Sequence, residues 1–356
     1  MEKIVIDARM INNSGIGVYI RSLVRRFSKS DKLVIHLLVY NNDVGCLGDM
    51  FHYIPIKSKI YSIGEIAELP LKIPKCDVFW TPHFNIPILP ISAKRRIVTI
   101  HDVYHLRFAD ELSWIKKWYA KLFYNLAIRL SDTIITVSEF SKSEINSLII
   151  HDKDINVIHN GFETLESGEI IEDKVYLEKY LLYVGNIKPH KNLEVLIEGF
   201  KLFKENFGKY EDLSLKIIGR DDNDEYSQYI KKSISSNNDI EMIGYVSNER
   251  LVQLYKGATI FILPSKYEGF GIPILEAFSY QIPVISSNAA SLPEVGGNAV
   301  LYFKSDSPEN LAGQLLKLVS NNKLQYKLVN LGVERMKLFS WKTSFELHKA
   351  LIVNEK

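Results

Sequence analysis

The chain has 356 residues, enough for two domains that each bury a core of their own. Its hydrophobic fraction of 46% and charged fraction of 24% are those of a soluble globular protein, and no stretch reaches the roughly 18 apolar residues of a membrane span. Two cysteines, Cys46 and Cys76, supply neither a disulfide framework nor the spacing of a metal site, and no signal peptide is visible. A cytoplasmic protein is expected.

Charge is unevenly distributed along the chain. Residues 1–160 contain 21 Lys and Arg against 16 Asp and Glu, a net charge of +5, whereas the remainder carries −3. A basic N-terminal half is evidence for an anionic acceptor or an anionic membrane surface. Nucleic acid would require a denser basic patch within a recognisable binding module, so no nucleic-acid partner is expected.

The first half alternates buried strands with loops and helices. Its expected elements are a helix at 18–27 and strands at 3–10, 32–40, 76–81, 96–100 and 132–138, with an irregular stretch between 40 and 76. Gly15 and Gly17 form a Gly-rich turn before the helix, which is either an anion-binding device or simply a tight turn. It is not the dinucleotide fingerprint, because Ile20 occupies the third glycine position.

Two further features of this half have competing interpretations. His101 directly follows the strand at 96–100, and a polar residue at a strand end is most often structural. Segment 112–130 interleaves aromatic and basic side chains at helical spacing. This pattern suits a helix that lies on a membrane interface, or equally a helix with a core-facing stripe and a solvated basic face. Ser138 is expected to cap the helix that follows the next strand.

The second half repeats the layout of the first. The polar segment 163–173 is the best candidate for a linker. A strand at 181–184 then leads through Gly185 into a loop and a helix that starts near Asn192. Lys191 lies at the start of this helix, where a lysine opposes the helix dipole, so a nearby anion would explain its presence.

Three aspartates follow a strand expected at 213–218. Asp221, Asp222 and Asp224 form a cluster that could bind a metal ion, but Asp and Asn are also ordinary turn-forming residues. The turn interpretation is favoured, and no metal is expected.

The strongest signal lies in residues 259–297. The segment reads as a strand, a loop with Glu268, Gly269 and Gly271, a helix from Ile272, a second strand at 283–286 and a further helix start near Pro293. This order is the repeating unit of a parallel α/β sheet, in which ligands bind at the carboxyl ends of the strands.

The residues of this unit suit a nucleotide sugar. The glycines allow the backbone to approach a ligand closely, and the helix N-terminus offers free N–H groups to a diphosphate. Glu276 on the helix can accept two ribose hydroxyls, which leaves Glu268 for a sugar. The alternative is that Glu268 is a solvated loop residue and Glu276 a helix-start acid favoured by the dipole.

The segment YEGFGIPILEA resembles the Glu-x₇-Glu segment of glycosyltransferase family 4, a family of retaining enzymes with the GT-B fold. The segments VTIHDVYHLRF, HNG and GNIKPHKN also resemble that family. The resemblance implies two Rossmann-like domains with parallel sheets facing a central cleft. Residues 1–168 would form the acceptor-side domain, residues 169–339 the nucleotide-sugar domain, and residues 340–356 a helix that crosses back to the first domain.

Residue roles follow from the same resemblance. The family places the first Glu by the donor hexose, the second on the ribose, a histidine near the donor sugar and a lysine on the diphosphate. The catalytic residues implied here are therefore His101, Glu268 and Lys191. The implied donor-binding residues are Gly15, Gly17, Gly185, Asn186, Lys188, Tyr245, Val246, Phe270, Gly271, Ile272, Leu275 and Glu276. His190 stands where the family commonly has an arginine, and Lys188 would supply the second positive charge.

The implied activity is transfer of a hexose from a nucleotide diphosphate sugar to a hydroxyl, without a metal or other cofactor. The combined motifs most resemble bacterial mannosyltransferases of O-antigen and surface-polysaccharide assembly, which favours GDP-mannose and an oligosaccharide acceptor that is lipid-linked. UDP-glucose, UDP-galactose and dTDP-rhamnose remain open as donors. A nucleotide-sugar epimerase and a catalytically silent donor-binding subunit are the alternatives. The enzyme would be cytoplasmic, or peripheral at the inner face of the membrane.

Overall fold

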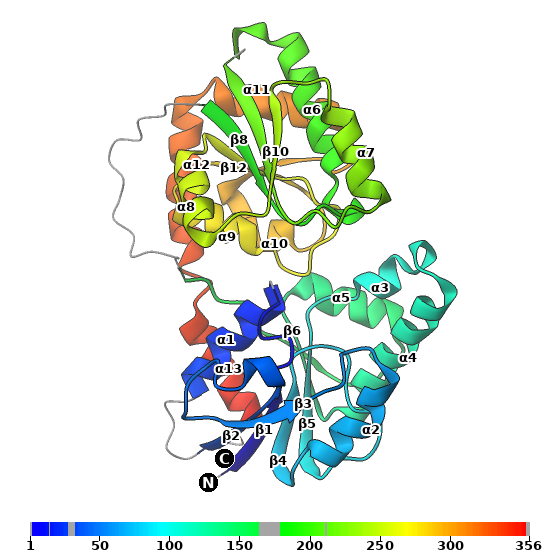
Figure 1. Cartoon of the computed structure of the whole chain (residues 1–356). Coiled ribbons are helices and arrows are strands. Elements are labelled where there is room, and N and C mark those ends of the chain that lie inside the picture. Colours follow the sequence, from blue (N-terminus) through cyan, green and yellow to red (C-terminus); the bar gives the residue numbers. More distant parts are fainter. Residues whose placement is uncertain (1, 14, 28–32, 164–178, 211, 354–356) are drawn as a thin grey trace. The chain divides into compact units, whose positions relative to one another are not determined.

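The computed structural model describes residues 2–13, 15–27, 33–163, 179–210 and 212–353, which form two compact units (Figure 1). Unit 1 comprises residues 1–161 together with 341–356, and unit 2 comprises residues 162–340. The sequence placed these limits at 168 and 339. The expected linker lies outside the described residues from residue 164 onward.

Unit 1 is built on a seven-stranded parallel sheet with the order β3-β2-β1-β4-β5-β6-β7. Its strands are β1 (Glu2–Asp7), β2 (Leu33–Tyr40), β3 (His52–Ile56), β4 (Cys76–Thr81), β5 (Ala93–Ile100), β6 (Thr133–Thr136) and β7 (Ile155–Val157). Its helices are α1 (Gly15–Phe27), α2 (Ile63–Lys72), α3 (Tyr104–Arg107), α4 (Trp114–Leu130), α5 (Glu139–Leu148) and α13 (Trp341–Ile352).

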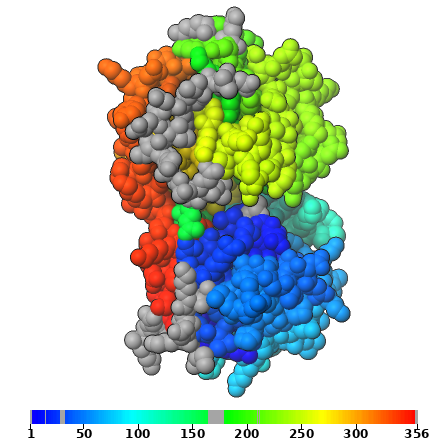
Figure 2. Space-filling model, turned by 60° about the vertical axis from the view of Figure 1, so that its left-hand side comes forward, coloured from blue at the N-terminus to red at the C-terminus, as the bar shows by residue number. Residues whose placement is uncertain are grey.

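The core of unit 1 lies on both faces of this sheet, because successive strand residues point to opposite sides. On β1, Ile4 and Ile6 belong to a cluster with residues of α1 and α13, whereas Val5 belongs to a cluster with Leu69 of α2. The last helix, drawn in red, lies beside α1 in blue (Figures 1 and 2). The carboxyl-terminal segment therefore completes the core of the amino-terminal unit.

Unit 2 contains a six-stranded parallel sheet with the order β10-β9-β8-β11-β12-β13. Its strands are β8 (Lys179–Val184), β9 (Leu213–Ile218), β10 (Ile240–Gly244), β11 (Ile260–Leu263), β12 (Val284–Ser287) and β13 (Val300–Phe303). Its α-helices are α6 (Leu193–Asn206), α7 (Glu225–Ile234), α8 (Asn248–Gly257), α9 (Ile272–Ser279), α10 (Leu292–Gly296), α11 (Pro308–Val319) and α12 (Asn322–Met336).

In both units the strand order reverses beside the first strand of the sheet. The reversal falls between β1 and β4 in unit 1 and between β8 and β11 in unit 2. Loops that leave the carboxyl ends of two such strands diverge to opposite faces of the sheet and leave room for a ligand between them. These two points are therefore the places where each unit is expected to bind ligands.

The structure corrects several expected boundaries. The first strand ends at Asp7 rather than at residue 10, and the following helix begins at Gly15 rather than at residue 18. The stretch between residues 40 and 76, expected to be irregular, contains β3 and α2. Both elements contain a proline, Pro55 in the strand and Pro70 in the helix, and proline interrupts the patterns that identify such elements. The cap at Ser138 is confirmed by its bond from Ser141 N.

Candidate active site

The candidate active site lies at the strand-order reversal of unit 2. The loop after β8 ends in a short 3₁₀ turn, Pro189–Lys191, and the loop after β11 carries Glu268. The Lys191 ammonium donates to Glu268 Oε1 at 2.6 Å, and Ser265 Oγ donates to the same oxygen at 2.8 Å. Among the described residues Glu268 Oε2 accepts no hydrogen bond. One carboxylate oxygen is thus fixed by the protein while the other is available to a ligand.

Glu268 is held as a carboxylate. Its side chain is only 14% exposed, and burial alone would raise its pKa. The charge of Lys191, with the hydrogen bonds from Lys191 and Ser265, instead holds the pKa of Glu268 below its ordinary value. The anion that stabilises Lys191 at its unfavourable position is therefore this carboxylate.

Asn192 ties together the loops that carry these charges. It has a left-handed backbone (φ 60°) and is completely buried. Its amide Nδ2 donates to the carbonyl of Pro264 at 3.0 Å and to that of Ser305 at 2.7 Å. The loops after β8, β11 and β13 are therefore joined at one side chain. Sequence alone predicts only that a helix starts near Asn192, because partners 72 and 113 residues away leave no local signal.

The Glu268 loop has a second clamp. Ser291 lies just before α10, and its Oγ is 2.8 Å from the carbonyl of Glu268 and 2.7 Å from that of Phe270. Its single hydroxyl proton can be donated to either. Gly271, the residue just before α9, has φ 119°, a conformation that favours glycine, and a Cβ there would lie 2.9 Å from Leu292. The loop is consequently held by the Ser291 hydroxyl and by the close packing at Gly271.

Glu276 lies on α9 as the fifth helical residue, beyond the first turn. The hydroxyl of Tyr255 donates to Glu276 Oε2 at 2.7 Å, and among the described residues Oε1 takes part in no hydrogen bond. Burial raises the pKa of Glu276, and the bond from Tyr255 opposes this only in part. A buried carboxylate outside the first turn gains little from the helix dipole. The dipole therefore does not explain this residue, and Oε1 can accept a hydroxyl.

The remaining donor-binding candidates of unit 2 fall into two groups. Gly185 and Asn186 follow β8, Ile272 begins α9, and Tyr245 and Val246 follow β10, with Tyr245 82% exposed. Phe270 and Leu275 are instead buried in the core, the Phe270 ring lying 5.6 Å from that of Phe339. The side chains of Phe270 and Leu275 are therefore not available to a ligand in this structure, so any contact with a donor would come from their backbone.

Lys188 is paired with carboxylates rather than left available to a ligand. Its amine lies 2.8 Å from Asp222 and 2.7 Å from Asp224, and Asp224 also caps α7 through the N–H of Ser227. Asp221 pairs with Lys231. Within the described ranges no group of three or more His, Cys, Asp or Glu side chains is arranged to hold a metal ion. The aspartate cluster thus forms a turn held by lysines.

His101 belongs to unit 1, where it follows β5. Its Nε2 lies 3.0 Å from the carbonyl of Pro82, and its ring packs edge-on against Tyr19 with ring centroids 4.8 Å apart. Burial lowers the pKa of His101 to about 4, although the Pro82 carbonyl opposes that shift. The imidazole is therefore neutral at pH 7. Because Nε2 donates to Pro82, Nδ1 can accept a hydrogen bond but cannot donate one.

The glycines of unit 1 have different roles. A Cβ on Gly17 would lie 2.5 Å from the carbonyl oxygen of Ile11, so this glycine allows α1 to pack against the preceding loop. A Cβ on Gly15 would meet nothing within 4 Å. Gly17 is thus required by packing, whereas Gly15 has no structural requirement of that kind.

The two Rossmann-like units, each with a parallel sheet and a strand-order reversal, have the GT-B fold. Residues 138–335 match the family of glycosyl transferases group 1, and residues 13–165 match Glycosyltransferase Family 4. The chain belongs to the glycosyl transferases group 1 family. The resemblance found in the sequence is thereby confirmed.

Similar proteins include several mannosyltransferases. The chain is 28% identical to O-antigen chain mannosyltransferase B of Escherichia coli over 280 residues, which is 74% of this chain and 71% of that protein. It is 27% identical to O-antigen chain mannosyltransferase RfbU of Salmonella typhimurium, over 72% of this chain and 69% of that protein.

Solved structures share the fold. The Anabaena protein HepE in complex with UDP-glucose matches 99% of this chain and 100% of its own length, with a TM-score of 0.78 and 14% identity. Sucrose-phosphate synthase from Thermosynechococcus elongatus matches 99% of this chain and 98% of its own, with a TM-score of 0.76 and 16% identity.

Proposed function

We propose that this glycosyltransferase moves mannose from GDP-mannose to a hydroxyl of a growing, lipid-linked polysaccharide, with retention at the anomeric carbon. The observation that carries the proposal is the convergence of Lys191, Glu268 and the start of α9 at the strand-order reversal of unit 2. The choice of mannose is supported by the two relatives named as O-antigen chain mannosyltransferases.

The donor is placed by charge complementarity. Lys191 offsets the negative charge of the diphosphate, the positive end of the α9 dipole adds to this effect, and Glu276 Oε1 accepts ribose hydroxyls. Glu268 Oε2 accepts a hydroxyl of the sugar. Such positioning and charge stabilisation lower the barrier most when they act on the leaving diphosphate. The assignment of His101 to the donor sugar rests on the family resemblance and stays a prediction.

Donor accounting separates this proposal from its alternatives. Purified protein is incubated with GDP-mannose with and without an oligosaccharide acceptor, and GDP, mannosylated product and any isomerised sugar nucleotide are quantified. Transfer yields one GDP per mannosylated product and an axial product bond, seen by NMR of the anomeric proton. An epimerase would convert the donor without acceptor, and a silent donor-binding subunit would consume none. Either result would reject the transferase.

Catalysis is expected to be independent of divalent metal. The three aspartates after β9 are engaged by Lys188 and Lys231 and by the cap of α7, so they are not preorganised as ligands. Activity should stay within about twofold of its starting value in excess EDTA. Loss of activity that Mn²⁺ or Mg²⁺ restores would instead identify a metal site, and Asp222→Asn would show whether this cluster forms it.

We further propose that unit 1 contacts an anionic membrane through the first turns of α4. Trp114 is 73% and Trp118 is 69% exposed, whereas the second half of the helix packs in the core through residues such as Phe123 and Ala127. Of the two interpretations of this segment, the core-facing stripe fits only the second half. In the described part of the chain no helix combines the length and apolarity needed to cross a bilayer.

The chemistry of this face suits the headgroup region. Lys116, Lys117 and Lys121 are exposed beside the tryptophans, and the ion pair of Lys117 with Asp110 is itself at the surface. Each basic residue near an anionic surface contributes about 1 kcal/mol to binding. Tryptophan rings that insert into the membrane add hydrophobic stabilisation. Attachment is expected to be reversible and sensitive to salt.

Vesicle co-sedimentation tests this surface. The protein should bind vesicles with anionic lipid at low salt, and Lys116→Glu with Lys117→Glu should weaken binding at least about tenfold. The control is Lys323→Glu with Lys327→Glu on α12, which makes the same charge change at exposed positions of unit 2. Binding that is equally weakened by both double variants would reflect net charge alone, and no binding at low salt would reject the membrane contact.

A further inference from the structure

Unit 1 contains a pocket of about 480 Å³ at the carboxyl edge of its sheet. Its lining includes Arg9 after β1, Asn13, Tyr40 at the end of β2, and Lys57, Lys59 and Tyr61 after β3. Among the described residues that line it, three are basic and none is acidic. The pocket therefore lies where parallel sheets bind ligands, and its exposed charges are the ammonium groups of Lys57 and Lys59.

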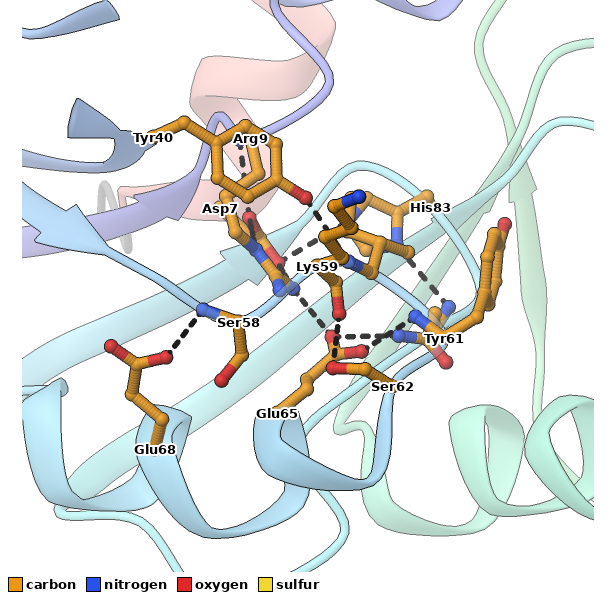
Figure 3. Close-up of polar contacts among 12 residues, drawn as sticks. Asp7, Arg9, Tyr40, Ser58, Lys59, Tyr61, Ser62, Glu65, Glu68 and His83 are labelled. Atoms are coloured by element: carbon orange, nitrogen blue, oxygen red, sulfur yellow. Dashed lines mark hydrogen bonds and ion pairs between the residues drawn. The ribbon is translucent and has the colours of Figure 1, made fainter. Parts of the chain in front are cut away.

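One wall of this pocket, formed by residues 57–61, is held in place by two glutamates of α2. Glu68 accepts the backbone N–H group of Lys57 at 3.0 Å. Glu68 also accepts the N–H of Ser58 at 2.7 Å, and Glu65 accepts that of Tyr61 at 2.8 Å (Figure 3). Tyr61 has φ 70°, a left-handed conformation that costs a non-glycine residue about 1 kcal/mol or more. The side chains of residues 57–61 are thus presented by a braced loop.

Arg9 connects Glu65 of α2 to Asp7, the last residue of β1, at the strand-order reversal. Its Nε and Nη2 donate to both oxygens of Asp7 at 2.8 and 2.6 Å, and Nη2 also reaches Glu65 at 2.6 Å. His83, which follows β4, lies 3.2 Å from Asp7 (Figure 3). The guanidinium is fully buried, and among the residues that the structure describes its Nη1 has no hydrogen-bond partner. The net stability that such a buried ion pair adds is small, because the desolvation of its charges offsets their attraction.

The lysines of the wall have no internal anion. Within the described part of the chain, the amines of Lys57 and Lys59 form neither an ion pair nor a hydrogen bond, and both residues are exposed. Tyr61 next to them is half exposed, and its ring stacks on Phe84 with centroids 5.9 Å apart. The pocket thus joins two available ammonium groups to an aromatic surface, as recognition of an anionic sugar requires.

We propose that this pocket binds a sugar that carries an oxyanion, either a phosphate or a carboxylate, with Lys57 and Lys59 on the anion and Tyr40 or Tyr61 against the ring. Resting on the proposed function, we assign this sugar to the acceptor. The acceptor of the reaction is then an anionic glycan rather than a neutral one, and its charge is read by unit 1.

Ligand-observed NMR titrations of the full chain test the pocket without donor. The probes are mannose 6-phosphate, glucuronate, inorganic phosphate and methyl α-mannoside. At least one of the two anionic sugars should bind about tenfold more tightly than methyl α-mannoside and more tightly than phosphate alone. Lys57→Ala with Lys59→Ala should weaken that binding at least about tenfold, as expected for lost charge-assisted hydrogen bonds.

Two control proteins locate the binding. Lys72→Ala with Lys75→Ala removes the same charge from exposed positions of unit 1 outside the pocket and should leave binding unchanged. Lys191→Ala should also leave it unchanged, since that residue lies in unit 2. Binding lost only in Lys191→Ala would place the anion in the donor site and overturn the proposal, as would equal affinity for methyl α-mannoside or for phosphate. Donor binding is measured separately by calorimetry. If the protein binds the anionic sugar in this pocket but binds no donor, the proposed function alone is rejected.

Discussion

Glu268→Gln should lower kcat by about 100-fold, or about 2.7 kcal/mol, with little change in the KM for donor. The amide keeps the shape of the side chain and can still accept the bond from Ser265, but it loses the negative charge that faces Lys191 and the sugar. The Lys191 ammonium, only 17% exposed, then has no counter-charge, and the free energy of unfolding should fall by about 1–3 kcal/mol.

The control for this variant is Glu334→Gln. Glu334 also forms an ion pair with a lysine of unit 2, Lys337, but both side chains are about two-thirds exposed. Steady-state kinetics and thermal unfolding should therefore match the wild type. A Glu268→Gln protein that lost stability yet kept its wild-type kcat would show a structural ion pair and contradict the catalytic assignment.

Glu276→Gln should weaken donor binding and strengthen the fold. Removing the carboxylate from the ribose site costs about 1–3 kcal/mol of affinity, equivalent to a roughly 5- to 150-fold rise in donor Kd. Gln keeps an oxygen for the Tyr255 hydroxyl. It also removes a carboxyl group whose ionisation is opposed by burial. Calorimetry for donor affinity and denaturant unfolding for stability measure the two effects on one protein.

The stability gain of Glu276→Gln depends on pH in a defined direction. The pKa of Glu276 is raised by burial above its ordinary 4.5, so the native state holds this proton at pH values where the unfolded state has released it. The penalty for ionisation is absent below pH 4.5 and grows as pH rises through the interval up to the raised pKa. The variant should thus match the wild type in acid and exceed it at neutral pH.

Glu249→Gln is the matched control here. Glu249 is an exposed acid in the first turn of α8 and represents the ordinary helix-start carboxylate. Its substitution should cost at most a few tenths of a kcal/mol and leave donor affinity unchanged. If Glu276→Gln behaved like Glu249→Gln in both measurements, Glu276 would have no role in the donor site.

The site of unit 2 could be predicted from sequence because its elements are local. Strand β11, the Glu268 loop and α9 lie within twenty residues of one another, and the glycines and Pro273 mark their boundaries. The partners that hold the site could not be predicted. Asn192 and Tyr255 reach it from other loops and helices, and a single hydrogen bond between distant residues leaves no periodic pattern.

The pocket of unit 1 shows the opposite case. Its wall and its brace come from β3 and α2, the two elements that the sequence treated as irregular. The pairing of Arg9 with Glu65 spans 56 residues, and that of His83 with Asp7 spans 76. Such pairs become visible only when a fold brings the strand ends together. The exposure of Trp114 and Trp118 could not be predicted either, because a helix pattern of aromatic and basic residues does not reveal which half of the helix is buried.

Calorimetric titration of nucleotide sugars tests the donor site of unit 2 most directly. GDP-mannose, UDP-glucose, UDP-galactose and dTDP-rhamnose are titrated into the wild-type chain, and the donor that binds is titrated into Glu276→Gln. We expect GDP-mannose to bind at least about tenfold more tightly than the other three, with affinity reduced in Glu276→Gln and unchanged in Glu249→Gln. Binding of none of the four donors, or a Glu276→Gln protein with wild-type affinity, would contradict it.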